Sequence, residues 1–219
     1  MMKIVAINGS PRNNKNTAIM LEHALKGAAS MGADVEILHL GDIEFKGCVS
    51  CFACKLKECP HPGFCLYEDR LTPFLAKAMA ADGIVLGSPI YFESTTGIMR
   101  SFLERLMFPV LTYTEGYKGL LDRKIPVGFV YTMNVPEDVM HQLDYLVGLK
   151  LTEADLQRLF GYCESITAND TLQFDDYSKY ICTVFAEEHK KQVQKEQFPK
   201  DCKRAFDLGV RLVEQVKDR

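Results

Sequence analysis

The fold is decided by the stretch Lys3-Ile4-Val5-Ala6-Ile7-Asn8-Gly9-Ser10-Pro11-Arg12, a short apolar strand that runs directly into a polar turn. An alanine-rich helix follows and begins at Asn16-Thr17. The first N–H groups of a helix have no partners within the helix, and the helix dipole favours negative charge at that end. A strand, a polar loop and a helix in this order therefore predict a phosphate-binding site.

The loop also carries side chains that can donate hydrogen bonds to one phosphate monoester. They are the hydroxyls of Ser10 and Thr17, the Asn16 amide and the Arg12 guanidinium. The loop lacks both the G-x-x-x-x-G-K-[ST] lysine of a nucleoside triphosphate site and the G-x-G-x-x-G of a dinucleotide site. We therefore expect a mononucleotide cofactor. The alternative is a Ser/Asn/Pro turn that only caps an ordinary helix.

Length, composition and charge limit the class of protein. The 219 residues, 47% of them apolar, suffice for one sizeable domain, so we expect a single domain over residues 1–219. A net charge of −3 gives no basic field that would attract nucleic acid. No apolar run approaches the roughly 18 residues of a membrane span. The first strand begins at residue 3, so we expect no signal peptide, no membrane contact and a cytoplasmic location.

Apolar periodicity alternates between strands and helices along the chain. The further predicted strands cover residues 35–40, 83–87, 125–131 and 165–168. Helices are expected over residues 18–28, about 70–81, 98–106 and 202–216. Such alternation predicts an α/β fold, a doubly wound parallel sheet with helices on both faces. Because ligands bind beyond the carboxyl ends of the strands in such sheets, the loops after the first, third and fourth strands should meet there.

The third predicted strand ends in a second informative loop, Ser88-Pro89-Ile90-Tyr91-Phe92. Pro89 stiffens the turn, and two aromatic residues follow it closely. A rigid loop with backbone donors and aromatic faces suits a flat heteroaromatic ring such as isoalloxazine. The alternative is an aromatic pair that packs into the core.

In roughly its first half the chain resembles the flavodoxin-like NAD(P)H-dependent FMN reductases, and among them the iron–sulfur flavoproteins. The matching motifs are Gly9-Ser10-Pro11-Arg12 with Asn16-Thr17, Gly47-Cys48-x2-Cys51-x2-Cys54, Gly87-Ser88-Pro89-Ile90-Tyr91-Phe92 and Gly97-Ile98-Met99-Arg100 leading to Glu104-Arg105. The resemblance implies a flavodoxin-like sheet of five parallel strands in the order 2-1-3-4-5. It implies FMN, with the phosphate at the first loop and the ring at Pro89, Ile90, Tyr91 and Phe92. Thr132-Met133-Asn134 would close on the other edge of the ring.

A cysteine-rich loop over residues 46–66 is the second strong signal. Three thiolates at x2 spacing, Cys48, Cys51 and Cys54, can reach three corners of a cubane. The fourth ligand could be Cys59, which precedes a proline as in ferredoxin loops, or Cys65. The resemblance implies a [4Fe–4S] cluster, and we take Cys48, Cys51, Cys54 and Cys59 as its ligands. Zinc, and free or structural thiols among the lysines of the loop, stay open as alternatives.

Four further segments carry expectations. Glu104-Arg105 is expected to pair locally on its helix, and Lys190-Lys191 to lie on a solvated helix face. Residues 174–180 resemble a segment of some of these proteins, and we expect a capped turn there, followed by a helical extension from about residue 178. Phe108-Pro109-Val110-Leu111-x-Tyr113, taken to follow the helix, is unusually apolar for a loop and is expected near the interface of a homodimer or homotetramer and close to the flavin.

The function that these features favour is that of an FMN-dependent oxidoreductase. It would accept hydride from NAD(P)H and pass electrons to a small molecule or a redox protein. The flavin performs this chemistry, so no catalytic side chain is predicted. One alternative is an iron–sulfur flavoprotein electron carrier with FMN and a [4Fe–4S] cluster. The other is a thiol-based redox or metal sensor that binds a partner.

Overall fold

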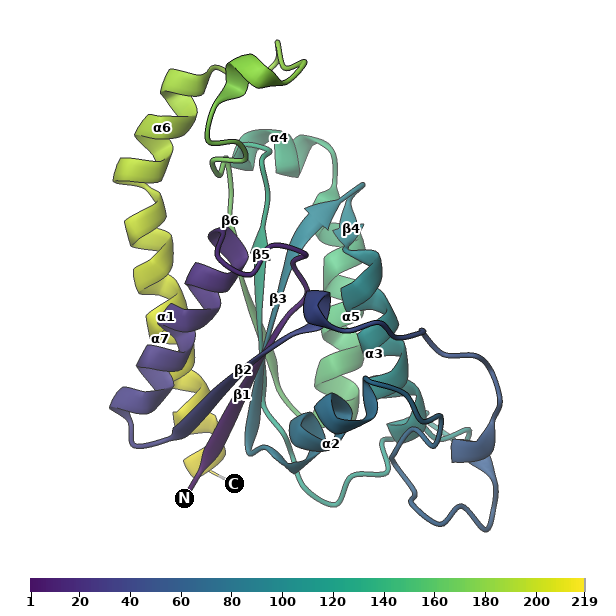
Figure 1. Cartoon of the computed structure of the whole chain (residues 1–219). Helices are drawn as coiled ribbons and strands as arrows, with labels where there is room; N and C mark the ends of the chain where they lie inside the picture. The colour runs from purple at the N-terminus through teal and green to yellow at the C-terminus, as the bar shows by residue number, and fades with distance from the viewer. Residues whose placement is uncertain (219) are drawn as a thin grey trace.

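A computed structural model describes residues 1–218 and contains a twisted parallel sheet with helices on both faces (Figure 1). The parallel strands are β1 (Lys3–Asn8), β2 (Asp34–His39), β3 (Gly83–Tyr91), β5 (Val127–Thr132) and β6 (Cys163–Ala168). They lie in the order β2-β1-β3-β5-β6, which confirms the predicted flavodoxin-like order. The sheet has a sixth strand, β4 (Ser94–Thr95), that the prediction of five omitted. It is two residues long and pairs antiparallel with the end of β3, so it leaves no periodic signal in the sequence.

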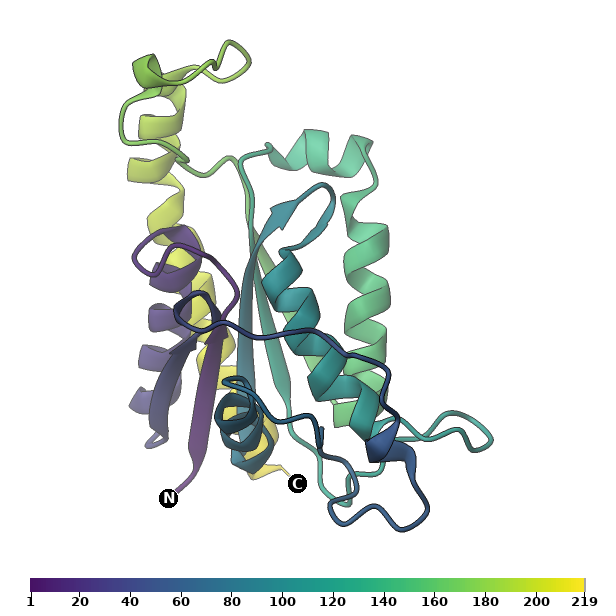
Figure 2. The same ribbon diagram turned by 45° about the vertical axis from the view of Figure 1, so that its right-hand side comes forward.

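The helices divide between the two faces of the sheet. One face is covered by α1 (Asn16–Ser30) and α7 (Phe198–Lys217), and the other by α2 (Thr72–Ala80), α3 (Gly97–Val110) and α5 (Tyr145–Phe160) (Figures 1 and 2). The short α4 (Glu137–Gln142) and α6 (Glu187–Glu196) lie towards the carboxyl edge of the strands. The described residues also form three single 3-10 turns, η1 (Leu40–Asp42), η2 (Ala53–Lys55) and η3 (Tyr177–Lys179). In residues 1–218 no helix is long and apolar enough to cross a membrane.

Successive residues of β1 supply both layers of the core. Ile4 and Ala6 belong to the core cluster that packs on α1 and α7, while Val5 and Ile7 belong to the cluster under α2, α3 and α5. All four side chains are fully buried. This is the pattern of a central parallel strand, which reads as a continuous apolar run because neither face meets water.

The helices α1 and α7 approach so closely that glycine is required at their crossing. A Cβ at Gly209 would lie 1.9 Å from the Ala24 carbonyl oxygen, and one at Gly27 would lie 2.0 Å from the Phe206 carbonyl oxygen. Backbone therefore rests directly on backbone, and α7 fixes the position of α1. The loop after β1 leads into α1, so the helix crossing also affects the position of that loop.

Two expectations about helices were wrong. Phe108-Pro109-Val110 lies within α3 rather than past it, and Pro109 and Val110 are buried. Pro109 lacks an N–H and α3 ends one residue later, which fits the way proline terminates helices. Lys190 of α6 is only 1% exposed, and its ammonium group donates to the Asn134 carbonyl and pairs with Asp170. A run of charges does not reveal a partner that lies on another element.

Candidate functional site

A pocket, here called the strand-end pocket, opens beyond the carboxyl ends of β1, β3 and β5. Its volume is about 180 Å³. It is lined by Ser10, Arg12, Lys15, Asn16, Thr17, Pro89, Ile90, Tyr91, Thr132, Met133, Asn134, Thr171, Gln173 and Phe174. All but two of the residues predicted to bind the cofactor therefore line one pocket, and the exceptions are Pro11 and Phe92. Phe92 is 95% exposed, because left-handed backbone at Phe92-Glu93 turns the chain back into β4.

Three contacts, from β3 and from the start of α3, fix the turn that follows β1. The Gly9 N–H donates to the Gly87 carbonyl of β3 at 2.8 Å. The Gly9 carbonyl accepts from the hydroxyl of Thr96 at 2.7 Å, and the same hydroxyl caps the start of α3. A side chain at Gly9 would collide with Met99, since its Cβ would lie 2.7 Å from the Met99 Cβ. The polar loop is therefore held at one height above the sheet, with glycine at the point of closest approach.

The start of α1 is available to an anion. Among residues 1–218, no side chain caps this helix, and its first turn holds no acidic residue. Ser10 and Thr17 are both 3% exposed and their side chains line the strand-end pocket. The Ser10 oxygen accepts from the Arg12 N–H at 3.1 Å, so its own hydrogen is free to donate. Uncapped N–H groups and two buried hydroxyls at one point suit a phosphate.

The segment Thr171–Phe174 forms a wall of the pocket that the sequence did not predict. The Arg12 guanidinium donates to the Gln173 carbonyl at 2.9 Å, and the Asn16 amide donates to the Leu172 carbonyl at 2.8 Å. Two of the four predicted phosphate donors therefore hold this wall. Lys15 adds an ion pair with Asp175 at 2.8 Å.

The wall continues into residues 174–180, which form the capped turn expected there. The Asp176 carboxylate accepts the Ser178 N–H at 3.0 Å and so caps η3. Phe174 stacks on Tyr180 with ring centroids 3.9 Å apart, and it meets Tyr177 edge-on. The turn thereby holds the aromatic ring of Phe174 at the rim of the pocket.

Among the described residues that line the strand-end pocket, one fully buried side-chain polar atom lacks a partner. The Asn134 amide nitrogen donates to the Gln173 side chain at 2.7 Å. Its carbonyl oxygen, Oδ1, is buried and has no hydrogen-bond partner within the described part of the chain. A buried acceptor without a donor is costly. The N–H edge of a heteroaromatic ring placed on Pro89–Tyr91 could supply the missing donor, so the residues present fit a flavin mononucleotide.

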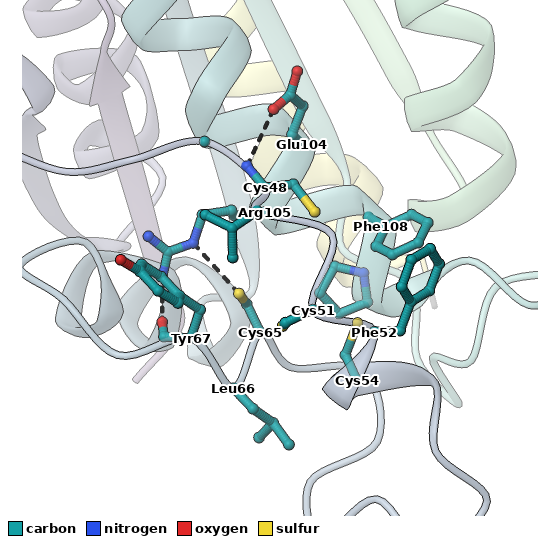
Figure 3. A pocket seen from close by; sticks show the side chains of 13 residues that line it. Cys48, Cys51, Phe52, Cys54, Cys65, Leu66, Tyr67, Glu104, Arg105 and Phe108 are labelled. Carbon is teal, nitrogen blue, oxygen red and sulfur yellow. Dashed lines mark hydrogen bonds between the residues drawn. The ribbon is translucent and has the colours of Figure 1, made fainter.

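The cysteine-rich loop forms a second pocket, here called the thiol pocket, against the C-terminal half of α3. Cys48, Cys51, Cys54 and Cys65 all line it, whereas Cys59 does not (Figure 3). Its volume of about 10 Å³ is room for about one water molecule. Within residues 1–218, no three His, Cys, Asp or Glu side chains converge on the site of a single metal ion. Four thiols around one hollow are nevertheless the donor set of a cluster that spreads its ligands over several irons, so the chemistry of the residues fits such a group once the hollow widens.

Arg105 forms the floor of the thiol pocket, and the expectation that it pairs along its own helix was wrong. It is 1% exposed, and it pairs with Asp69 at 2.6 Å. The guanidinium also donates to the carbonyls of Lys46 and Tyr67, so one side chain ties both ends of the loop. Burial raises the pKa of Asp69, but the hydrogen bonds from Arg105 and from the backbone N–H groups of Leu71 and Lys46, with the charge of Arg105, together outweigh burial and hold that pKa below its usual value.

Two further contacts hold the loop to α3. Glu104 does pair locally, with Arg100 at 3.7 Å, and it also accepts the Cys48 N–H at 3.2 Å. A Cβ at Gly47 would lie 2.8 Å from the Glu104 Oε2, so a side chain there would displace that carboxylate. The Lys55 ammonium donates to the carbonyls of Phe108 and Leu111, which are free at the end of α3.

The two pockets lie at opposite ends of α3. The strand-end pocket is beside Thr96 at the start of that helix, and the thiol pocket is lined by Arg105 and Phe108 near its end. The views in Figures 1 and 2 agree, with the blue cysteine-rich loop far from the carboxyl edge of the strands. The twelve residues of helix from Gly97 to Phe108 span about 17 Å along the helix axis.

Both the sequence and the fold of this chain resemble those of known proteins. A family model described as NADPH-dependent FMN reductase matches residues 2–146. An iron–sulfur flavoprotein from Archaeoglobus fulgidus is 42% identical over 104 residues, which is 48% of this chain and 48% of that protein. An iron–sulfur flavoprotein from Methanocaldococcus jannaschii is 36% identical over 104 residues, 48% of this chain and 51% of that protein. The chain thus spans about half the length of the curated relatives it matches.

Solved structures share the fold at low sequence identity. The NAD(P)H:quinone oxidoreductase from Methanothermobacter marburgensis superposes with a TM-score of 0.70 at 14% identity, over 96% of this chain and 98% of that one. An azoreductase from Bacillus anthracis gives a TM-score of 0.68 at 14% identity, over 96% of this chain and 100% of that one. These likenesses establish the flavodoxin-like fold.

Proposed function

The chain belongs to the NADPH-dependent FMN reductase family, and we propose that it is an FMN-dependent oxidoreductase that takes hydride from NAD(P)H. The observation that carries this proposal is the strand-end pocket. Loops from three strands and the uncapped start of α1 meet there, and all but two of the residues predicted for FMN from sequence line it. Bound FMN would supply the redox chemistry, and the chain would supply binding and orientation.

The side chains divide the work of binding between phosphate and ring. The hydroxyls of Ser10 and Thr17, with the first N–H groups of α1, would hold the phosphate. Pro89–Tyr91 and Thr132–Asn134 would hold the two edges of the ring. Arg12 and Asn16 act one step away, because their present contacts fix the wall at residues 171–174.

The test is titration of the purified protein with FMN, followed by anaerobic addition of NADH or NADPH. We expect tight FMN binding, weaker riboflavin binding and loss of the flavin's visible absorbance on addition of at least one nicotinamide. Equal affinity for FMN and riboflavin would contradict the phosphate assignment. Bound flavin that neither nicotinamide reduces would contradict the proposed activity.

We also propose, as a second function, that the cysteine-rich loop carries an iron–sulfur cluster and that the protein relays electrons. Four thiols lining one hollow favour this, and the two relatives above are iron–sulfur flavoproteins. The electron acceptor would be a small molecule or a redox protein. The active assembly would be a homodimer or homotetramer. Anaerobic protein should then contain iron and acid-labile sulfide in equal amounts, and protein with FMN but neither of these would contradict the cluster.

A further inference from the structure

We infer that Lys190 of α6 is a positioning residue for the flavin site, because it fixes Asn134 at the edge of the ring. This inference rests on the proposal that FMN binds in the strand-end pocket. Asn134 lines that pocket, and Lys190 approaches it from α6, at the carboxyl edge of the sheet (Figure 1). The Lys190 ammonium donates to the main-chain carbonyl of Asn134 at 2.5 Å. Lys190 therefore acts on the pocket through Asn134.

Asn134 is a residue whose position matters to a ligand. Its side-chain oxygen, Oδ1, is buried and lacks a partner among residues 1–218. Its amide nitrogen is already bound to the Gln173 side chain at 2.7 Å, so the oxygen is the atom left for a ligand. A hydrogen bond weakens steeply when its length or angle departs from a narrow range. The backbone of Asn134 must therefore be held still, and Lys190 binds that backbone.

The loop around Asn134 is held from two sides. The carbonyls of the residues before and after Asn134 accept the N–H groups of residues 171 and 170, both at 3.0 Å. The Asn134 carbonyl between them is bound by Lys190 instead. The same ammonium pairs with the Asp170 carboxylate. Lys190 thereby joins the loop after β5 to the segment after β6, which continues into the wall of the pocket.

The environment of Lys190 replaces the water that its charge has lost. The side chain is buried, with Asp170 as its counter-ion and the centre of the Phe185 ring 4.3 Å from its nitrogen. A buried ammonium is costly unless it is paired and hydrogen-bonded, so these contacts hold it in one place. His189 lies 2.5 Å from the other oxygen of Asp170 and steadies that carboxylate. The ammonium therefore presents a fixed donor to Asn134.

The test compares the parent with Lys190→Met and with a matched control, Lys191→Met, whose lysine is exposed on the same helix and pairs with Glu187. Flavin-free protein is titrated with FMN and with riboflavin, and flavin fluorescence reports binding. Lys190→Met should weaken both ligands alike, by about two- to tenfold, which is the range for one hydrogen bond. Lys191→Met should leave both affinities unchanged.

A double variant tests whether Lys190 acts through Asn134. Asn134→Ala alone should weaken both flavins by about two- to tenfold. Adding Lys190→Met to Asn134→Ala should then cost less than about a further twofold, because the group that Lys190 positions is already gone. The visible absorbance of the bound flavin should shift in the same direction in Lys190→Met and in Asn134→Ala, and it should match the parent in Lys191→Met.

Hydrogen exchange without flavin separates movement of the loop from general destabilisation. In Lys190→Met the N–H groups of residues 170 and 171 should exchange faster, while those of β1 keep the rates of the parent. If Lys190→Met does not fold, Lys190→Gln takes its place, since it keeps a donor without the charge. Lys190→Gln should give the same pattern with smaller losses.

The remaining outcomes contradict either the inference or the proposal beneath it. Unchanged flavin binding, a loss for FMN alone, additive losses in the double variant, or faster exchange throughout the chain would each overturn the role of Lys190 and leave the FMN site standing. A parent protein that binds neither FMN nor riboflavin would overturn the proposed function itself.

Discussion

The strand-end pocket and the thiol pocket are built by opposite means. In the first, regular elements place the backbone: β1, β3 and α3 fix the turn at Gly9 through main-chain groups and a cap. In the second, residues 43–71 contain one 3-10 turn and two non-glycine residues at positive φ, Ser50 and Phe52. There the cysteine-rich loop is positioned by the side chains of Arg105, Lys55 and Glu104. We therefore expect the folded structure around the strand-end pocket to tolerate the loss of one side chain. The loop around the thiol pocket should not tolerate the loss of Arg105, which acts as a clamp.

The largest expected effect follows from removing the clamp. Arg105→Met should lower the free energy of unfolding by about 3–5 kcal/mol, because it leaves Asp69 without its partner and three carbonyl or sulfur acceptors without a donor. Urea denaturation of the metal-free protein measures this. The control is Arg158→Met, whose arginine is exposed and pairs with Asp155, and it should cost about 1 kcal/mol or less. Similar losses in the two variants would remove the contrast between the pockets.

The next effect tests whether the strand-end pocket depends on the helix crossing beneath it. Gly209→Ala should cost about 2–3 kcal/mol, because the added Cβ meets the Ala24 carbonyl at 1.9 Å. Gly97→Ala is the matched control, since nothing lies within 4 Å of a Cβ there. Denaturation should find Gly97→Ala as stable as the parent or slightly more so. If Gly209→Ala were equally harmless, α7 would not fix α1.

The roles of Thr17 and Arg12 in the phosphate loop can be separated by comparing FMN binding with riboflavin binding. Thr17→Ala should weaken FMN binding about ten- to a hundredfold, because a charge-assisted hydrogen bond contributes roughly 1.5–3 kcal/mol, and it should leave riboflavin binding unchanged. Arg12→Ala should instead weaken both ligands alike, since its side chain holds the wall through the Gln173 carbonyl. Fluorescence titration separates the two patterns. A loss specific to FMN in Arg12→Ala would place that guanidinium on the phosphate.

These contrasts mark what the sequence could predict. The strands and the loops at their carboxyl ends follow from apolar periodicity and from rules for strand ends, which act locally. The strand order and the lining residues Thr132–Asn134 came from the family resemblance. The wall at residues 171–174 follows from neither, because its partners Arg12 and Asn16 lie more than 150 residues away and nothing periodic marks it. The burial of Arg105 was missed for the same reason: its spacing from Glu104 and Arg100 looks like an ordinary charged helix face.

The smallest expected effect is a pH dependence of stability that comes from the buried thiol of Cys163. Burial, and then the neighbouring Glu153, raises the pKa of Cys163 to about 12. A folded-state pKa above the unfolded one means that this contribution to stability is complete below about pH 9 and is lost as the pH rises towards 12. By pH 10 the free energy of unfolding should fall by about 1 kcal/mol. Cys163→Ala should flatten this slope in urea denaturation, whereas Cys48→Ala, at an exposed thiol, should leave it unchanged.

The crossing of α1 and α7 at Gly27 and Gly209 bears on how this fold could be cut and reused. The family model ends at residue 146, yet the helix that seats α1 and the wall that closes the strand-end pocket both come after it. A graft of residues 2–146 onto another protein would carry the phosphate loop without α7 and without the wall at residues 171–174. The shortest unit that can be transplanted runs through α7, so gene fusions and deletions should keep the two halves of the chain together.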